Sequence, residues 1–280
     1  MTQRIDVHSL SQRLEEPDVR IFDVRFSLDQ PAQGRSEFAA AHIPGARYLH
    51  LDEDLSAPVI PGETGRHPLP EPEQMQALLR RAGVNQHTQV IVYDDGPGLF
   101  ASRLWWMLRW LDHGRVGILD GGFKAWQEAG LPVTQETPRP VAEGNFVARA
   151  DNGKLIDADE IHRRLDDPSL QLLDARGPAR FTGEAEPIDP VAGHIPGAAN
   201  LPCAANVNDN GNWLDNEQLG KRFEPWTKGD AELVAYCGSG VTACHTILAA
   251  VEAGLPEPRL YAGSWSHWIT DPGRPVATGE

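Results

Sequence analysis

The chain has 280 residues, of which 40% are hydrophobic and 23% are charged. This length is enough for about two domains, since one hydrophobic core commonly serves about 100–200 residues. The 40 acidic and 25 basic side chains leave a formal net charge of −15, which repels phosphate backbones and argues against a nucleic-acid partner.

The cysteines and the N-terminal residues bear on cofactors and compartment. Cys203, Cys237 and Cys244 form no C-x-x-C pair and no zinc spacing with the histidines, so we expect neither a bound metal nor a disulfide framework. The first 18 residues lack the apolar region of a signal peptide, and no apolar run approaches the about 20 residues that span a bilayer. The sequence therefore predicts a cytoplasmic protein without a membrane segment.

The first half of the chain alternates short apolar runs with helical patterns. The run R-I-F-D-V-R at 20–25 precedes the motif A-H-I-P-G-A at 41–46. Helix formers that end at a glycine predict a helix over 74–83. The fully apolar run at 89–94 is typical of a strand that is covered on both faces. A longer helix is predicted over 99–111.

The second half repeats these segments in the same order, which indicates two copies of one domain. The alternation of strands and helices predicts an α/β fold in which each domain has a parallel sheet with helices on both faces. In such sheets the reactive crevice lies at the carboxyl ends of the strands. The recurring pairs are 20–25 with 171–176, 41–46 with 193–198, 90–98 with 233–240, and 119–126 with 261–268.

The segment between the two copies predicts the domain boundaries. Residues 134–145 read T-Q-E-T-P-R-P-V-A-E-G-N, and this proline-rich, polar composition is typical of a linker. We predict a first domain over 1–136, a linker over 137–153 and a second domain over 154–280.

One cysteine stands in a setting that favours reactivity. Cys237 follows the apolar run A-E-L-V-A-Y and precedes G-S-G, after which a helical pattern resumes. A free cysteine is often only a small buried hydrophobe. However, glycines let successive N–H groups turn toward one point, and the start of a helix adds positive potential; both favour a thiolate. The matching residue of the first copy is Asp94, so cysteine chemistry is expected in the second copy alone.

The doubled H-I-P-G-A, the block L-D-G-G-F…W and the loop C-G-S-G-V-T-A together resemble the two-domain rhodanese-type sulfurtransferases, over nearly the whole chain. The loop is similar to that of the 3-mercaptopyruvate sulfurtransferase branch. The resemblance implies tandem rhodanese-like domains, the first non-catalytic and the second catalytic. It implies that Cys237 takes a sulfane sulfur as a persulfide and passes it to a thiol, cyanide or a thioredoxin-like protein. No metal or organic cofactor is implied. The amides expected to cradle the sulfur lie in the loop, at Gly238, Gly240, Val241 and Thr242.

The loop also bears on the sulfur donor. A thiosulfate-type loop is expected to carry Lys or Arg to hold the dianion, and this loop carries neither. Loss of sulfur from mercaptopyruvate leaves an enolate that needs a proton, and Ser239 lies where a relay would be useful. By resemblance, Ser239 is paired with His67 and Asp52, an arrangement that recurs in unrelated enzymes. The alternative is that Ser239 is a turn residue and His67 a solvated loop histidine.

The donor's carboxylate calls for a guanidinium, whose fork matches it better than a lysine does. The resemblance points to Arg180 and to Arg103, although Arg103 could instead form an ion pair on a helix surface. The branch usually carries a second arginine after a Glu-Pro in this loop, where this chain has Ile188 and Asp189.

We therefore expect 3-mercaptopyruvate as the donor, and three alternatives remain open. The nearest is a thiosulfate:cyanide sulfurtransferase on the same scaffold. The second is a cysteine phosphatase, whose loop ends in an arginine where this chain has Ala243. The third is a non-catalytic rhodanese-like binding module.

Overall fold

The computed structural model describes residues 3–227, 229 and 231–280, which fall into two compact units. Each unit is built from several stretches of the chain. Unit 1 runs to Ala57, continues from Leu69 to Asp151 and includes Asp209–Trp213, whereas unit 2 comprises Pro58–Pro68, Asn152–Asn208 and the chain from Leu214.

Besides the assignment of Asp209–Trp213 to unit 1, these units differ from the predicted domains in two ways. First, Pro58–Pro68 belongs to unit 2 although it lies within the first repeat of the sequence. Second, most of the predicted linker packs on unit 1. Phe146 is fully buried, and its N–H donates to the carbonyl of Val84 at 3.2 Å. Composition identified a polar connecting segment, but it did not reveal that one aromatic side chain anchors this segment to the core.

The described part of unit 1 contains a five-stranded parallel sheet in the order β1-β5-β4-β2-β3. Its middle strand, β4, has almost wholly buried side chains, as its apolar run predicts. The strands are β1 (Arg4–Ile5), β2 (Val19–Asp23), β3 (Arg47–Tyr48), β4 (Gln89–Tyr93) and β5 (Val116–Leu119).

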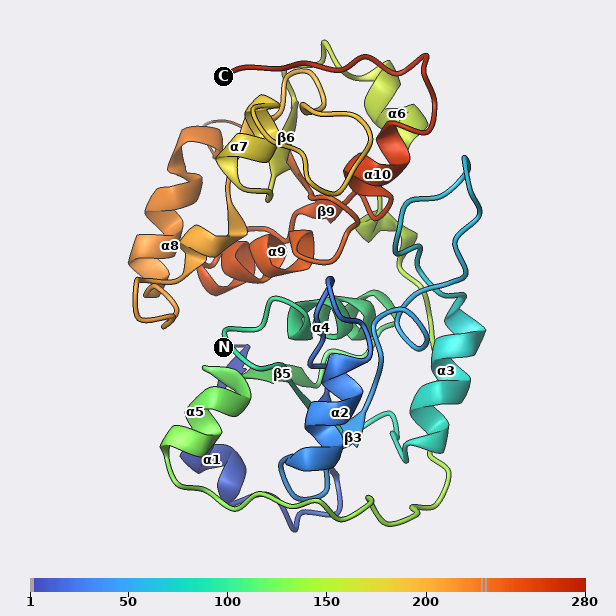
Figure 1. Ribbon diagram of the computed structural model, residues 1–280, viewed down its shortest axis with the longest axis vertical. Coiled ribbons are helices and arrows are strands. Elements are labelled where there is room, and N and C mark those ends of the chain that lie inside the picture. Colours follow the sequence, from blue (N-terminus) through green and yellow to red (C-terminus); the bar gives the residue numbers. More distant parts are fainter. Residues whose placement is uncertain (1–2, 228, 230) are drawn as a thin grey trace. The chain divides into compact units, whose positions relative to one another are not determined.

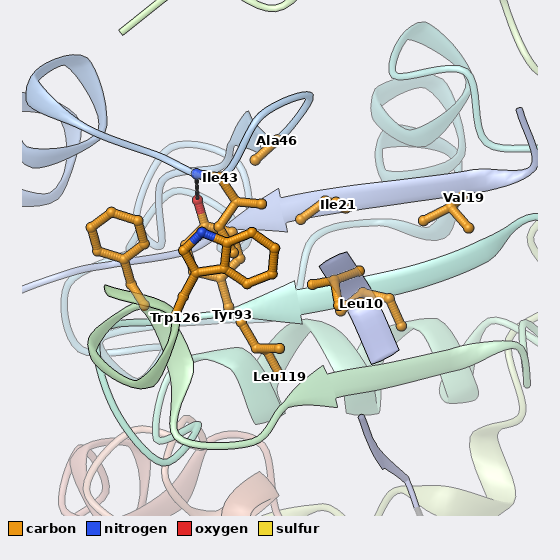
Figure 2. Close-up of a cluster of buried hydrophobic side chains, with 10 residues drawn as sticks. Leu10, Val19, Ile21, Ile43, Ala46, Tyr93, Leu119 and Trp126 are labelled. Carbon is orange, nitrogen blue, oxygen red and sulfur yellow. Dashed lines mark hydrogen bonds between the residues drawn. The ribbon is translucent and has the colours of Figure 1, made fainter. Parts of the chain in front are cut away.

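Helices cover both faces of this sheet (Figure 1). Figure 2 shows the core on one face, where Leu10 and Trp126 pack against Ile21 and Tyr93. The helix α4 contacts the strands β4 and β5. The helices of unit 1 are α1 (Val7–Ser11), α2 (Gln33–Ala40), α3 (Pro72–Arg81), α4 (Ala101–Trp110) and α5 (Gly122–Glu128).

Unit 2 repeats the architecture with a parallel sheet in the order β7-β6-β8-β9, which corresponds to β3-β2-β4-β5 of unit 1. Its strands are β6 (Leu170–Asp174), β7 (Ala199–Asn200), β8 (Glu232–Tyr236) and β9 (Arg259–Leu260). Its α-helices are α6 (Ala158–Arg163), α7 (Pro178–Thr182), α8 (Asn216–Phe223), α9 (Ala243–Glu252) and α10 (Ser264–Trp268). The short 3₁₀ helices are η1 (Asn152–Lys154), η2 (Cys203–Asn206) and η3 (Glu224–Trp226).

The faces of the second sheet are covered in the same way. Side chains of α6 and α10 pack with β6 and β8 in one apolar cluster. The helix α9 contacts β8 and β9, and α8 packs on α9 (Figure 1). None of the helices in the described residues is long and apolar enough to cross a membrane.

The same buried polar contacts occur within each unit, which confirms that one domain occurs twice. In each unit a strand aspartate pairs with an arginine two residues later, and a strand tyrosine hydroxyl accepts the N–H of the isoleucine in H-I-P-G-A. Figure 2 shows this hydrogen bond of unit 1, between Ile43 and Tyr93. The histidine of that motif stacks on a phenylalanine in both units, which explains its presence in each copy structurally. The matched residues are Asp23–Arg25 with Asp174–Arg176, Tyr93–Ile43 with Tyr236–Ile195, and His42–Phe38 with His194–Phe181.

Candidate active site

The cysteine loop lies where β8 ends and before α9 begins. The loop backbone is fixed by the start of α10, because the carbonyl of Cys237 accepts the N–H of Trp265 at 3.0 Å and that of Gly238 accepts the N–H of Ser266 at 2.9 Å. Gly240 has φ +78°, and a Cβ added there would lie 2.2 Å from the carbonyl oxygen of Ala262. Both the backbone conformation and the available space therefore require glycine at this position.

Cys237 is held by its neighbours rather than displayed to solvent. Cys237 is only 2% exposed, although it lies in a loop, where residues are usually more exposed. The N–H of Gly240 donates to Sγ at 3.2 Å, and the N–H of Cys237 itself donates to Ser264 Oγ at 3.1 Å. The carbonyls of Val241 and Thr242 accept N–H groups of the first turn of α9. The roles of Gly238, Val241 and Thr242 toward a bound sulfur stay predictions.

The matching loop of unit 1 shows how this fold holds an anion. The Asp94 carboxylate follows β4 as Cys237 follows β8, and it is 4% exposed. One oxygen accepts N–H groups at 3.0 and 3.1 Å and the other accepts them at 2.8 and 3.1 Å. The donors are Gly96, Gly98, Phe100 and Ala101. The strand-to-helix loop of this domain is thus a group of converging backbone amides.

A segment of the first repeat brings a histidine to the cysteine loop. Pro58–Pro68, which we call the strap, belongs to unit 2 and packs tightly there, because a Cβ added at Gly65 would lie 2.5 Å from the carbonyl oxygen of Gly263. His67 Nδ1 lies 2.7 Å from Ser239 Oγ. Both residues are buried, with exposures of 6% and 7%, so His67 is not a solvated loop histidine. Two of the predicted relay residues therefore meet.

Guanidinium groups lie beside Gly238. A Cβ added there would be 2.7 Å from Arg66 Nη2 and 3.4 Å from Arg180 Nη1. Arg180, in the middle of α7, is the arginine that the resemblance predicts near the site, whereas Arg66 is not predicted. Its signal in the sequence is its position directly before His67 in G-R-H-P-L-P.

Two carboxylates pair with these arginines. Arg180 lies 2.8 Å from Glu186 and 2.9 Å from Asp189, and Arg66 also pairs with Asp189. Burial raises the pKa of Asp189 above its ordinary value. Burial also acts on Glu186, but hydrogen bonds from Arg180 and from backbone amides outweigh it and lower the pKa of that carboxyl.

Asp52 and Arg103 belong to unit 1. Asp52 is exposed, and its N–H donates to the ring of His50 at 3.1 Å. Arg103 in α4 is fully buried, and Nη2 donates to the carbonyl of Leu55 at 3.5 Å. Their proposed roles toward His67 and the substrate stay predictions.

The surroundings of the other two cysteines do not favour a thiolate. Burial, with the neighbouring Cys237 adding to it, raises the pKa of the Cys203 thiol to about 11. Cys244 is fully buried in α9, and its Sγ donates to the carbonyl of Gly240 at 3.4 Å. In the part of the chain that the structure describes, no cluster of three His, Cys, Asp or Glu side chains could hold a metal ion.

Comparisons with known proteins agree with this fold. The profile of the Rhodanese-like domain matches residues 6–129 and again residues 157–271, so the chain belongs to the rhodanese-like family, as predicted. The chain is 51% identical over 283 residues to the "Probable 3-mercaptopyruvate sulfurtransferase" of Pseudomonas aeruginosa, covering 99% of each. It is 36% identical to the thiosulfate sulfurtransferase of Gallus gallus, over 90% of this chain and 86% of that protein. The crystal structure of the Escherichia coli 3-mercaptopyruvate sulfotransferase SseA matches with a TM-score of 0.82 and 32% identity, covering 95% of this chain and all of SseA (100%).

Proposed function

We propose that this chain is a sulfurtransferase that moves a sulfane sulfur from 3-mercaptopyruvate, through a persulfide on Cys237, to an acceptor nucleophile. The names of the relatives support this reading, because they include 3-mercaptopyruvate and thiosulfate sulfurtransferases. The observation that carries the choice of donor is the contact between His67 Nδ1 and Ser239 Oγ at 2.7 Å, two residues beyond the cysteine. A hydroxyl polarised by a histidine is a proton source that mercaptopyruvate requires and thiosulfate does not.

The first half-reaction loads the cysteine. The Cys237 thiolate attacks the sulfur of 3-mercaptopyruvate, so an S–S bond forms while the C–S bond breaks. The electron pair of the C–S bond passes to carbon as the enolate of pyruvate. Ser239 donates a proton to that carbon and regains, through His67, the S–H proton that the donor's sulfur gives up as the persulfide anion forms; pyruvate is released. The transferred sulfur is oxidised to the sulfane level and the carbon that held it is reduced.

The second half-reaction unloads the cysteine. A thiolate of a small thiol or of a thioredoxin-like protein, or cyanide, attacks the outer sulfur of the persulfide anion. The S–S bond breaks, and its electron pair returns to Cys237 as thiolate. Between the two steps the loop stabilises the anion, as the amide of Gly240 does for Sγ and as the corresponding amides do for Asp94.

The remaining predicted residues act on binding and orientation. Arg180 binds the donor's carboxylate, since its guanidinium lies beside Gly238. Asp52 orients His67, and Arg103 adds to the binding of the substrate. The expected cytoplasmic location belongs to the same proposal.

Labelling with sulfur tests the enzymatic reading. After incubation with 3-mercaptopyruvate, mass spectrometry of the intact chain should show a gain of one sulfur. Cys237→Ser should abolish the gain, whereas the matched variant Cys244→Ser should retain it. The absence of any gain with either donor would identify a binding module instead. A phosphatase assay should be negative because Ala243 stands where that class needs an arginine.

Thiosulfate is the second candidate donor, because the guanidiniums of Arg66 and Arg180 could hold its charge. The variant Ser239→Ala separates the two donors. We expect turnover with mercaptopyruvate to fall about 100-fold, the usual size of a lost general acid, and turnover with thiosulfate to change less than about 3-fold. Ser169→Ala, an exposed serine ahead of β6, is the control. Equal losses with both donors would refute the role of Ser239 as a proton donor.

A further inference from the structure

Arg66 and Arg180 reach the cysteine loop from different parts of the chain. Arg66 comes from the strap and Arg180 from α7, and both guanidiniums lie against Gly238. The backbone of Arg66 is fixed in this place, because its N–H donates to Ser266 Oγ at 3.1 Å. Its side chain is 30% exposed and that of Arg180 is 19% exposed, so a small anion can reach both.

A carboxylate of the chain itself already joins these two arginines. Asp189 Oδ2 lies 2.9 Å from Arg180 Nη2, and Oδ1 pairs with Arg66 Nη1. Each oxygen thus faces a different guanidinium, which is the arrangement that a bound carboxylic acid would adopt between them. The Asp189 side chain is only 4% exposed. Burial opposes its ionisation, as the raised pKa shows, so the two arginines stabilise a charge that the site would otherwise disfavour.

We propose that Arg66 and Arg180 form a two-guanidinium site for the carboxylate of the donor, and that Asp189 occupies this site until the donor displaces it. The inference rests on the proposed function for the identity of the donor. Arg66 is then a substrate-binding residue, and Asp189 is an internal competitor that raises the donor concentration required.

Kinetics of two charge-neutral variants test both parts. In Asp189→Asn the competing charge is gone, and we expect KM for 3-mercaptopyruvate to fall about 10-fold. In Arg66→Gln a charge-assisted hydrogen bond to the donor is lost, and we expect KM to rise about 10- to 100-fold. The control is Glu232→Gln. Glu232 also pairs with two arginines, Arg164 and Arg259, but at the opposite end of β8. The KM of this variant for 3-mercaptopyruvate should therefore not change.

Binding of pyruvate gives a readout that does not depend on turnover. Pyruvate carries the same carboxylate but no sulfur, and its affinity for the Cys237→Ser chain can be measured by ligand-observed NMR titration. Adding Asp189→Asn to this chain should tighten the binding about 10-fold, and adding Arg66→Gln should weaken it about 10- to 100-fold. A merely structural ion pair would lower stability in both variants without tightening the binding in either.

The outcomes are distinguishable. Unchanged affinity for pyruvate in Arg66→Gln overturns the role of Arg66, and unchanged or weaker affinity in Asp189→Asn overturns the competition. If the unaltered chain gains no sulfur from 3-mercaptopyruvate, the proposed function fails. The pyruvate titrations would still decide whether the two arginines form a carboxylate site.

Discussion

Replacing Asp94 by alanine should destabilise unit 1 severely, because two buried backbone N–H groups would lose their acceptor. The hydrogen bonds from Gly98 and Ala101 are buried, whereas those from Gly96 and Phe100 are partly exposed and can be replaced by water. A buried donor left without an acceptor costs about 1–3 kcal/mol, so the two buried donors together cost about 2–6 kcal/mol. We expect a loss of about 4 kcal/mol from the free energy of unfolding of unit 1.

Native-state hydrogen exchange, read by mass spectrometry, can assign this loss to one unit. Amides of β4 report on unit 1 and those of β8 report on unit 2. A loss of about 4 kcal/mol should accelerate exchange in β4 by about 1,000-fold and leave β8 nearly unchanged. Asp95→Ala is the matched control, because Asp95 is the exposed neighbour in the same loop and should cost less than about 0.5 kcal/mol.

The outcome bears on the cysteine loop as well. A loss below about 1 kcal/mol in Asp94→Ala would mean that these amides do not depend on an anion. The corresponding amides of unit 2 would then have no precedent within this chain for stabilising a thiolate or a persulfide.

Three further predictions concern the loop, a buried histidine and the second thiol. Gly240→Ala should abolish the gain of sulfur, since its Cβ would lie 2.2 Å from a carbonyl oxygen at φ +78°; an intact gain by mass spectrometry would contradict this. Burial lowers the pKa of His113, so the unfolded state binds a proton that the folded state excludes, and the stability of unit 1 should fall as pH drops below about 6.5. The protection factors of the β4 amides, which are corrected for the intrinsic exchange rate at each pH, should therefore fall less in His113→Asn than in the unaltered chain between pH 7 and pH 5. Because the pKa of Cys203 is about 11, its alkylation by iodoacetamide should rise about 10-fold per pH unit between pH 8 and pH 10; a plateau by pH 9, read by peptide mass spectrometry, would contradict its burial.

The fold could be predicted from the sequence because its strands and helices follow from local patterns of apolar residues that occur twice. The fully apolar runs at 89–94 and 231–236 became the central strands β4 and β8, and the loop after β8 carries the cysteine. Repetition also separated structural from reactive residues, since His42 and His194 occur in both units while Cys237 has Asp94 as its counterpart.

The partners of the site were harder to predict, because they depend on contacts between distant parts of the chain. Resemblance pointed to His67, and the structure places it against Ser239. Arg66 was missed because its partner Asp189 is far away in the sequence, and neither residue has a periodic or compositional signal. The loop itself contains no Lys or Arg, as the sequence shows, but two arginines reach Gly238 from the strap and from α7. Similarly, periodicity describes a helix or strand, but it does not indicate which unit a polar segment such as 58–68 joins.

The strap has a consequence for how this protein can be divided. A fragment that starts after the first repeat would contain the cysteine, its loop and a complete sheet, yet it would lack the histidine and one arginine that lie against them. The first repeat lacks the nucleophile but is still required, because it contributes a segment of its chain to the unit that contains Cys237. Two similar units thus share one chain unequally, since eleven residues of the first repeat, Pro58–Pro68, belong to the second unit.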